Sequence, residues 1–294
     1  MSWPKLSENV KMIDTSKWNG DIDFVELASE NPDIKVNICR IAGAWNGHDP
    51  KFEHNYEQSL QTGFDVGGYL NTNPYYSVSH MMKWWKKAIG KKKLPLIVVD
   101  AETNGWREDG KWVHRSSASK TTKHVQDVIA AVQNEWPDSA LWVYSGHWWV
   151  GNTNIIHGWE GDLKFWTPHY PYFLQDAVTG DWRQSRNYDE LDCYLPIHNN
   201  FTPRIPTGVT KENVIAWQIS EKGILRGITQ PGKLAPNCDL NYLLKTEYDR
   251  VFLKTEPQPT EPVDVSGEIT FRMNVTDNQL VVAASGDIPI TVEG

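Results

Sequence analysis

The sequence predicts an α/β protein whose strands close into a barrel that is regular on one side and irregular on the other. In the first half of the chain, short and almost continuously apolar runs alternate four times with helix-length amphipathic segments. Connections of that length join parallel strands through right-handed crossovers, and unbroken apolar runs are typical of strands covered on both faces. The rhythm then breaks, and three further strands follow without long helices between them.

The alternation gives the expected elements in order. Strands are predicted at 10–14, 36–43, 65–71, 94–102 and 139–146, with helices between them at 21–31, 50–63, 77–90 and 117–136. Asp23 lies near the start of the first helix, and Gly63 and Gly90 follow the ends of two others, as capping preferences favour. Strands at 164–170, 213–220 and 238–244 complete the barrel.

Three stretches depart from the barrel pattern, one within the predicted barrel domain of residues 1–252 and two after it. Residues 171–212 form a polar, Pro-containing insertion, and connections of that length are usually functional or flexible. Alternating Pro, Thr and Glu predict an extended linker over 253–264. The last segment, 265–294, is β-rich but too short for a good independent core, so we expect it to pair with another copy or to dock on the main domain.

Charge and composition exclude several classes of function. The 294 residues carry a formal net charge of -8, which disfavours nucleic-acid binding and simple attachment to an anionic membrane. No apolar run approaches the ~20 residues of a membrane span. The opening residues lack the apolar core of a signal peptide, so we expect folding in a reducing cytoplasm. The three cysteines and the histidines show neither disulfide-framework nor zinc-like spacing, and no metal site is predicted.

Acidic residues stand at the ends of several predicted strands. The run "LIVVDAE" ends in Asp100 and Glu102, whose spacing directs both carboxylates to the same face. Asp14 ends another parallel strand, and Asp239 lies at the start or edge of the last one. Catalytic groups gather at the C-terminal ends of strands in βα barrels, so we expect all four acids to border one cleft. A lone Asp-x-Glu is more often a helix cap or an ion-pair partner, and this pattern needs its context.

Neighbouring carboxylates are suited to glycosidic bond cleavage. One must hold a proton for the leaving oxygen while another stays ionised to stabilise positive charge on the sugar, and closely held acids push their pKa values apart. The chain also contains 15 Trp, whose flat faces suit sugar rings, although we expect most of them to pack in the core. Six aromatic residues at or just beyond strand ends are candidate sugar contacts, of which we expect about half to touch sugar and the others to pack: Tyr69, Trp106, Tyr144, Trp166, Tyr170 and Trp217.

Several motifs, in order along the chain, resemble glycoside hydrolase family 25, the Chalaropsis-type lysozymes common among phage endolysins and bacterial autolysins. They are "MIDTSKWNGDIDF" at the first strand, the run "DPKFEHNYEQSLQTGFDVGGY", the "VVDAE" signature, and "WQIS" followed by "CDLNYL". The resemblance covers roughly residues 10 to 246. It implies a flattened, irregular TIM-like barrel, (β/α)5(β)3, followed here by the short β-rich C-terminal extension.

The resemblance also implies a role for each acid. Glu102 matches the general acid, which later serves as general base, and Asp100 matches the acid that orients the 2-acetamido group or stabilises charge. Asp14 and Asp239 match two further acids that line the cleft. The implied substrate is the β-1,4 bond between N-acetylmuramic acid and N-acetylglucosamine in peptidoglycan, with no metal or cofactor. Asp100 as direct nucleophile and acetamide participation both stay open, and the resemblance leans to a retaining, substrate-assisted route.

One departure and two rival functions accompany this interpretation. Leu70 and Asn71 stand where family members often have His and an aromatic residue, which puts the sugar contacts there in doubt. A non-catalytic cell-wall carbohydrate-binding protein on a decayed barrel predicts the loss of an acid, yet all four are present. A chitin-cleaving enzyme predicts a longer Asp-rich motif, which "IVVDAE" lacks.

The leading interpretation is a peptidoglycan-cleaving muramidase. Without a signal peptide, we expect a phage endolysin that stays in the host cytoplasm until a separate membrane-permeabilising protein releases it to the cell wall, with a virion-associated lysin as a variant. Because the chain is acidic, an anionic wall repels it at low salt, so a wall-binding element in the C-terminal segment would help. Self-association through that segment is the other expectation.

Overall fold

The computed structural model describes residues 6–44, 47–109, 111–150, 155–172, 174–176, 179–194, 202–229, 237–253, 272–276 and 279–283. The chain divides into two compact units, Met1–Lys254 and Thr255–Gly294. Residues 254–264 of the predicted linker lie outside the described residues. Within the described part of the chain, no helix is both long and apolar enough to cross a membrane.

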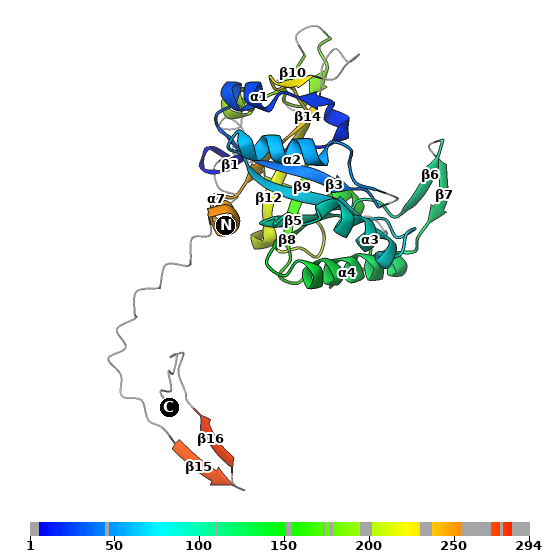
Figure 1. Ribbon diagram of the computed structural model, residues 1–294, viewed down its shortest axis with the longest axis vertical. Coiled ribbons are helices and arrows are strands. Elements are labelled where there is room, and N and C mark those ends of the chain that lie inside the picture. The colour runs from blue at the N-terminus through cyan, green and yellow to red at the C-terminus, as the bar shows by residue number, and fades with distance from the viewer. Residues whose placement is uncertain are drawn as a thin grey trace. The chain divides into compact units, whose positions relative to one another are not determined.

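Eight strands of the first unit close into a barrel, confirming the predicted fold class (Figure 1). Around the barrel they are β1 (Val10–Thr15), β14 (Cys238–Leu243), β12 (Val214–Gly223), β9 (Lys164–Pro168), β8 (Ala140–Tyr144), β5 (Leu96–Asp100), β4 (Asp65–Asn71) and β3 (Ile34–Ala42). Neighbouring strands are parallel except at β14, which runs antiparallel to both β1 and β12. The predicted strands are all present and end within a few residues of these bounds.

Helices connect the parallel strands, as the alternation predicts. They are α1 (Phe24–Glu30), α2 (Phe52–Gln61), α3 (Val78–Ile89), α4 (Ala118–Glu135) and the short α5 (His147–Val150). Three of them begin at a side-chain cap that accepts a hydrogen bond from a backbone N–H in the first turn, from Asp23, Ser77 and Ser117. The starts of these three helices are therefore fixed by identifiable capping residues.

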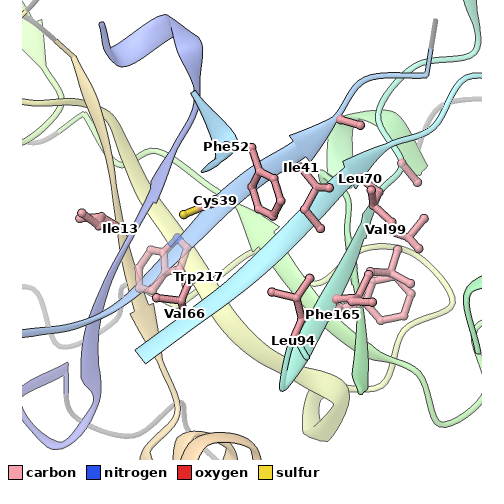
Figure 2. Packing of buried hydrophobic residues seen from close by; sticks show 14 of the residues in the cluster. Ile13, Cys39, Ile41, Phe52, Val66, Leu70, Leu94, Val99, Phe165 and Trp217 are labelled. Carbon is pink, nitrogen blue, oxygen red and sulfur yellow. The ribbon is translucent and has the colours of Figure 1, made fainter. Parts of the chain in front are cut away.

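The strands bury two separate apolar layers, because successive side chains point to opposite faces. The barrel interior holds Met12, Val36, Ile38, Leu96 and Val98. The layer between strands and helices is built from the alternate residues, among them Ile13, Ile41, Leu70, Val99 and Trp217 (Figure 2). A residue's place in this alternation therefore decides whether it points into the barrel or outward.

The 171–212 insertion supplies cover where the barrel lacks a long helix. It contains the hairpin β10 (Leu174–Gln175) and β11 (Trp182–Arg183), followed by α6 (Tyr188–Tyr194). Tyr188 is buried, and its hydroxyl donates to the carbonyl of Asn241 on β14 at 2.9 Å. Asp192 of α6 accepts hydrogen bonds from Lys11 on β1 at 2.8 Å and Tyr242 on β14 at 3.0 Å. Part of the insertion is thus a structural lid on the outside of β1 and β14.

The remaining elements are short. The hairpin β6 (Gly105–Glu108) and β7 (Lys111–Arg115) follows β5, and β2 (Asp21–Ile22) pairs with β13 (Ile228–Thr229). The helix α7 (Lys245–Tyr248) and a π-helical turn (Asp249–Leu253) end the described part of the first unit. In the second unit, β15 (Arg272–Thr276) and β16 (Gln279–Ala283) form an antiparallel hairpin.

Candidate active site

The strand alternation places polar side chains above the apolar interior of the barrel. On β1 the inward series runs Val10, Met12 and then Asp14, and on β5 it runs Leu96, Val98 and then Asp100. Each interior row therefore changes from apolar to acidic at the C-terminal end of its strand. Because β14 runs the other way, its N-terminal residues lie at this same end, and Asp239 pairs directly with Asp14.

The four acids predicted from the sequence line one pocket at this end of the barrel. Its walls are formed by Asp14, Tyr69, Asp100, Glu102, Tyr144, Trp166, Gln218 and Asp239. A wider, more open groove adjoins the pocket and shares its acids. The groove is further lined by Ser16, Trp18, Asn19, Arg40, Asn71, Glu221 and Asn237.

Glu102 lies two residues beyond Asp100 and is half-buried. The preceding residue, Ala101, is fixed to the next strand, because its N–H donates to Tyr144 O at 2.9 Å and its carbonyl accepts from Ser145 Oγ at 2.7 Å. Burial first, and then the charges of Asp14 and Glu221, raise the pKa of Glu102 to about 7. Near neutral pH this carboxyl can therefore both hold and release a proton.

Asp100 is buried, and its two oxygens have different surroundings. The Asn71 side-chain amide donates a hydrogen bond to Oδ2. Among the described residues, the buried Oδ1 has no hydrogen-bond partner, and the same holds for Oδ1 of Asn71. Burial and the nearby charge of Glu102 raise the pKa of Asp100 well above its ordinary range. An unpartnered buried oxygen is costly, so this atom is available to accept a donor from a ligand.

Asp14 and Asp239 form a second acidic pair on the opposite wall. Burial raises the pKa of Asp14 to about 6, and it raises the pKa of Asp239 well above its usual range, with the Asp14 charge adding to the effect. Asn241 Nδ2 donates to Asp14 Oδ2 at 3.0 Å and is itself fixed by Trp166, whose Nε1 donates to Asn241 Oδ1 at 3.0 Å. These bonds fix the orientation of the Asp14 carboxylate.

A buried cation lies beside the acids. Arg40 and Asp49 are both buried, and Nη2 of Arg40 lies 2.5 Å from Asp49 Oδ2. Asp49 also accepts from the backbone N–H of Lys17 at 3.1 Å and of Lys51 at 2.9 Å. The Arg40 charge lowers the pKa of Asp14 and of Asp100, against the larger effect of burial.

The aromatic candidates occupy three kinds of place. Tyr69, Tyr144 and Trp166 line the pocket. Tyr170 lies beside it, with its hydroxyl 3.0 Å from Gln218 Oε1, which also accepts from the Tyr144 hydroxyl at 2.5 Å. Trp106 lies outside the pocket, on the β6–β7 hairpin.

Trp217 requires a correction. Its side chain has 0% of its surface exposed and belongs to the layer between strands and helices (Figure 2). There it stacks on His169 with ring centroids 6.0 Å apart. The inward position belongs instead to its neighbour Gln218, which lines the pocket. The expectation that Trp217 contacts sugar is wrong, because the period-two alternation turns it away from the groove.

Several residues that line the pocket or the groove are not among the sugar-binding or catalytic residues that the sequence predicts. Arg40 continues the inward series of Val36 and Ile38, so the same alternation that placed the acids could have identified it. Gln218 stands in the "WQIS" motif, one residue after the candidate chosen there. Trp18 follows β1 in the first motif and is 67% exposed at the groove.

Among the described residues, no group of three or more His, Cys, Asp or Glu side chains is arranged to hold a metal ion. The groups that line the pocket include four carboxyl groups, which can carry acid–base chemistry. A carboxyl with a pKa of about 7 stands beside a buried second acid in a pocket walled by aromatic rings. This combination is suited to general acid–base catalysis on a sugar.

Three solved structures share the fold. The bacterial lysozyme from Streptomyces coelicolor has a TM-score of 0.56 and 17% identity, covering 80% of this chain and 91% of that chain. A family 25 glycosyl hydrolase from Bacillus anthracis has a TM-score of 0.59 and 14% identity, covering 85% and 97%. A lysozyme of the same family from Aspergillus fumigatus has a TM-score of 0.56 and 16% identity, covering 83% and 99%.

The match to a family model points the same way as the fold. No curated protein matches the sequence. The model of the family described as glycosyl hydrolases family 25 matches residues 13–228, which is most of the 294-residue chain. The matched range contains the end of β1 and the whole of β5, with Asp14, Asp100 and Glu102. The chain belongs to glycosyl hydrolase family 25.

Proposed function

We propose that the protein is a peptidoglycan N-acetylmuramidase, a lysozyme that hydrolyses the β-1,4 bond between N-acetylmuramic acid and N-acetylglucosamine. The observation that carries the proposal is the pair at the end of β5. Glu102 has a pKa of about 7, and Asp100 beside it keeps one buried oxygen that no described residue partners. The substrate class is supported by two solved relatives, the Acremonium alcalophilum muramidase and the Streptococcus pneumoniae autolysin LytC in complex with a synthetic peptidoglycan ligand.

In the first step, Glu102 donates its proton to the glycosidic oxygen as the bond from that oxygen to C1 breaks. Asp100 Oδ1 accepts a hydrogen bond from the N–H of the 2-acetamido group, which directs the acetamide oxygen toward C1. The acetamide oxygen then forms a bond to C1, and Asp100 stabilises the positive charge that develops on the acetamide group. The leaving sugar departs with the proton from Glu102.

In the second step, water attacks C1 and the bond from C1 to the acetamide oxygen breaks. Glu102, now a carboxylate, takes the proton from water and returns to its starting state. Two displacements at C1 give net retention of configuration. Asp14, whose pKa of about 6 leaves it mostly ionised at neutral pH, supplies negative potential on the opposite wall, where it favours a positively charged transition state.

Product analysis on purified peptidoglycan tests the proposal. We expect the wild type to release fragments with N-acetylmuramic acid at the reducing end, and Glu102→Gln to lose activity by at least about 100-fold, because the exchange removes the proton donor. Glu212→Gln is the matched control, since this exposed acid precedes β12 at the other end of the barrel. Release of other reducing ends by the wild type, or an active Glu102→Gln variant, contradicts the proposal.

We further propose that the enzyme acts as a phage endolysin, held in the host cytoplasm until a membrane-permeabilising protein gives it access to the wall. One solved relative in fold is the CTP1L endolysin. Expression of the chain in a susceptible host, with and without a separate permeabilising protein, tests this role. Lysis only in the presence of that protein supports it, whereas recovery of the chain from purified virions identifies a virion-associated lysin instead.

A further inference from the structure

A row of aromatic rings lies outside the acid pocket, on the two loops that leave β4 and β5. The Trp106 ring, on β6, lies 6.5 Å from the Tyr75 ring between centroids, with 34° between the planes. Tyr75 in turn meets Tyr76 edge to face at 5.1 Å, and Tyr76 stacks on His80 of α3 at 5.5 Å. Residues far apart in the sequence therefore build one continuous aromatic surface. We call Tyr75 and Trp106 the aromatic platform.

Hydrogen bonds between the two loops hold the platform in place. Thr103 Oγ1 donates to the carbonyl of Thr72 at 2.8 Å. Asn73 Nδ2 donates to the carbonyl of Gly105 at 2.8 Å, and Asn73 Oδ1 accepts from the Tyr75 N–H at 3.0 Å. The platform is therefore tied to the loop that carries Glu102, and it has a defined position relative to the pocket.

The platform also lies close to the pocket. Tyr75 stands four residues after Asn71, and Trp106 stands four residues after Glu102, and both of these earlier residues line the groove. Even fully extended, four residues span at most about 14 Å. A polymer bound across the acids thus needs only a few sugar units to reach the platform.

The surroundings of the platform combine apolar ring faces with polar and charged side chains, as sugar-binding surfaces do. Tyr75 is 50% exposed. Trp106 Nε1 donates to Glu108 Oε1 at 3.2 Å, which holds the indole beside a carboxylate. A shallow groove next to Tyr75 and Tyr76 is lined by Pro74 and Val78 as well as by Lys120, Lys123 and Asp127. Flat aromatic faces bordered by charged donors and acceptors match the apolar faces and hydroxyl rims of sugar rings.

We propose that the aromatic platform is a secondary sugar-binding site that holds the glycan strand away from the bond being cleaved. The identity of the strand as peptidoglycan glycan rests on the proposed function. Because the platform does not touch the reacting atoms, it contributes to substrate affinity and not to the chemical step. Long glycan strands use it, and oligosaccharides that span only the acid pocket do not.

The test uses the full chain with Tyr75→Ala and Trp106→Ala combined. We expect KM for peptidoglycan glycan strands to rise about tenfold with little change in kcat, and kinetics on a short oligosaccharide to stay at the wild-type level. Trp182→Ala is the matched control, because it removes a 62% exposed aromatic residue on β11. Tyr75→Phe keeps the ring and should keep the affinity. The proposal is overturned if the double variant has an unchanged KM, or if its kcat/KM falls equally on long and short substrates.

Binding separates this inference from the proposed catalytic function. Co-sedimentation of Glu102→Gln with insoluble glycan measures affinity without turnover, and adding the two platform substitutions should weaken it about tenfold. If the wild type cleaves nothing but the platform substitutions still weaken binding, the catalytic proposal fails and the platform stands. If they leave binding unchanged, the platform is refuted whatever the catalytic result. Equal thermal melting of all variants excludes misfolding as the cause.

Discussion

Glu102 lies half-buried just beyond β5, and burial raises its pKa from an ordinary 4.5 to about 7. The folded state therefore binds this proton more tightly than the unfolded state does. The stability that follows is fully present below pH 4.5 and is lost as the pH rises through about 7. A group that is tuned for proton transfer near neutrality thus destabilises the fold in alkaline solution.

Glu102→Gln removes this effect, because the amide stays neutral at every pH. We expect the variant to be more stable than the wild type at pH 8 by roughly 3 kcal/mol, and to match it near pH 4. Urea unfolding at the two pH values measures the difference. Glu212→Gln, at an exposed position, should match the wild type at both. If the difference in unfolding free energy between Glu102→Gln and the wild type were the same at both pH values, burial would not be what sets this pKa.

The acids could be predicted from the sequence because each one ends, or begins, a run of apolar residues. Other parts of the site depend on neighbouring strands. Asn71 contacts Asp100 only because the two residues are paired between β4 and β5. Arg40 and Asp49 meet across a loop, and no local pattern announces their ion pair. Trp217 shows the opposite case, a local pattern that misleads. It lies one residue before the pocket-facing Gln218, so its side chain points to the other face of β12 and packs there.

At the scale of elements, the barrel strands and long helices were predictable because their patterns repeat over many residues. The β6–β7 hairpin was not among the expected strands, although "EDGK" contains Asp-Gly, a common turn signal between strands. Asp109 has φ 49°, the left-handed conformation that such turns require. The β2–β13 pairing has no such signal, because each strand is two residues long and its partner is distant in the sequence.

Gly227 secures the β2–β13 pairing beside α1. Its φ is +87°, and an added Cβ would lie 2.5 Å from the carbonyl oxygen of Asp23 and 2.6 Å from the backbone nitrogen of Leu27. Backbone atoms cannot move aside cheaply, so we expect Gly227→Ala to lower the free energy of unfolding by at least about 3 kcal/mol. Gly63→Ala is the control, because φ is +89° there but nothing lies within 4 Å, and we expect a cost of about 1 kcal/mol.

Urea unfolding of both glycine variants measures these costs. If both variants lost the same free energy of unfolding, the backbone conformation alone, and not the close approach to α1, would account for the loss at Gly227. Activity per folded molecule should be unchanged for Gly63→Ala.

At the scale of the whole molecule, the second unit has only a two-stranded hairpin among its described residues. Such a hairpin is marginally stable alone in water, and its outer strand edges can pair with another chain. We predict that the full chain self-associates through Thr255–Gly294, and that a chain ending at Lys254 is a monomer. Light scattering over a range of concentrations measures the two masses. Equal monomer masses for both chains would exclude self-association.

The first unit contains the whole acid pocket, so the shortened chain should keep its turnover of soluble glycan. A loss confined to intact cell walls would assign wall binding to the second unit instead. The structure places the boundary between the two units after Lys254. The composition of the chain predicts a boundary in this region, but it does not identify the partner of the last segment.

The antiparallel strand β14 also bears on how the protein is made. Contacts between Asn241 and Asp14 join residues 227 positions apart, so we expect them to form late and to slow the closing of the barrel. During synthesis, a ribosome that has not yet released β14 carries a chain with three of its four acids and an open pocket wall. We expect such nascent chains to be inert, so that the producing cell meets an active enzyme only after translation of each molecule is nearly complete.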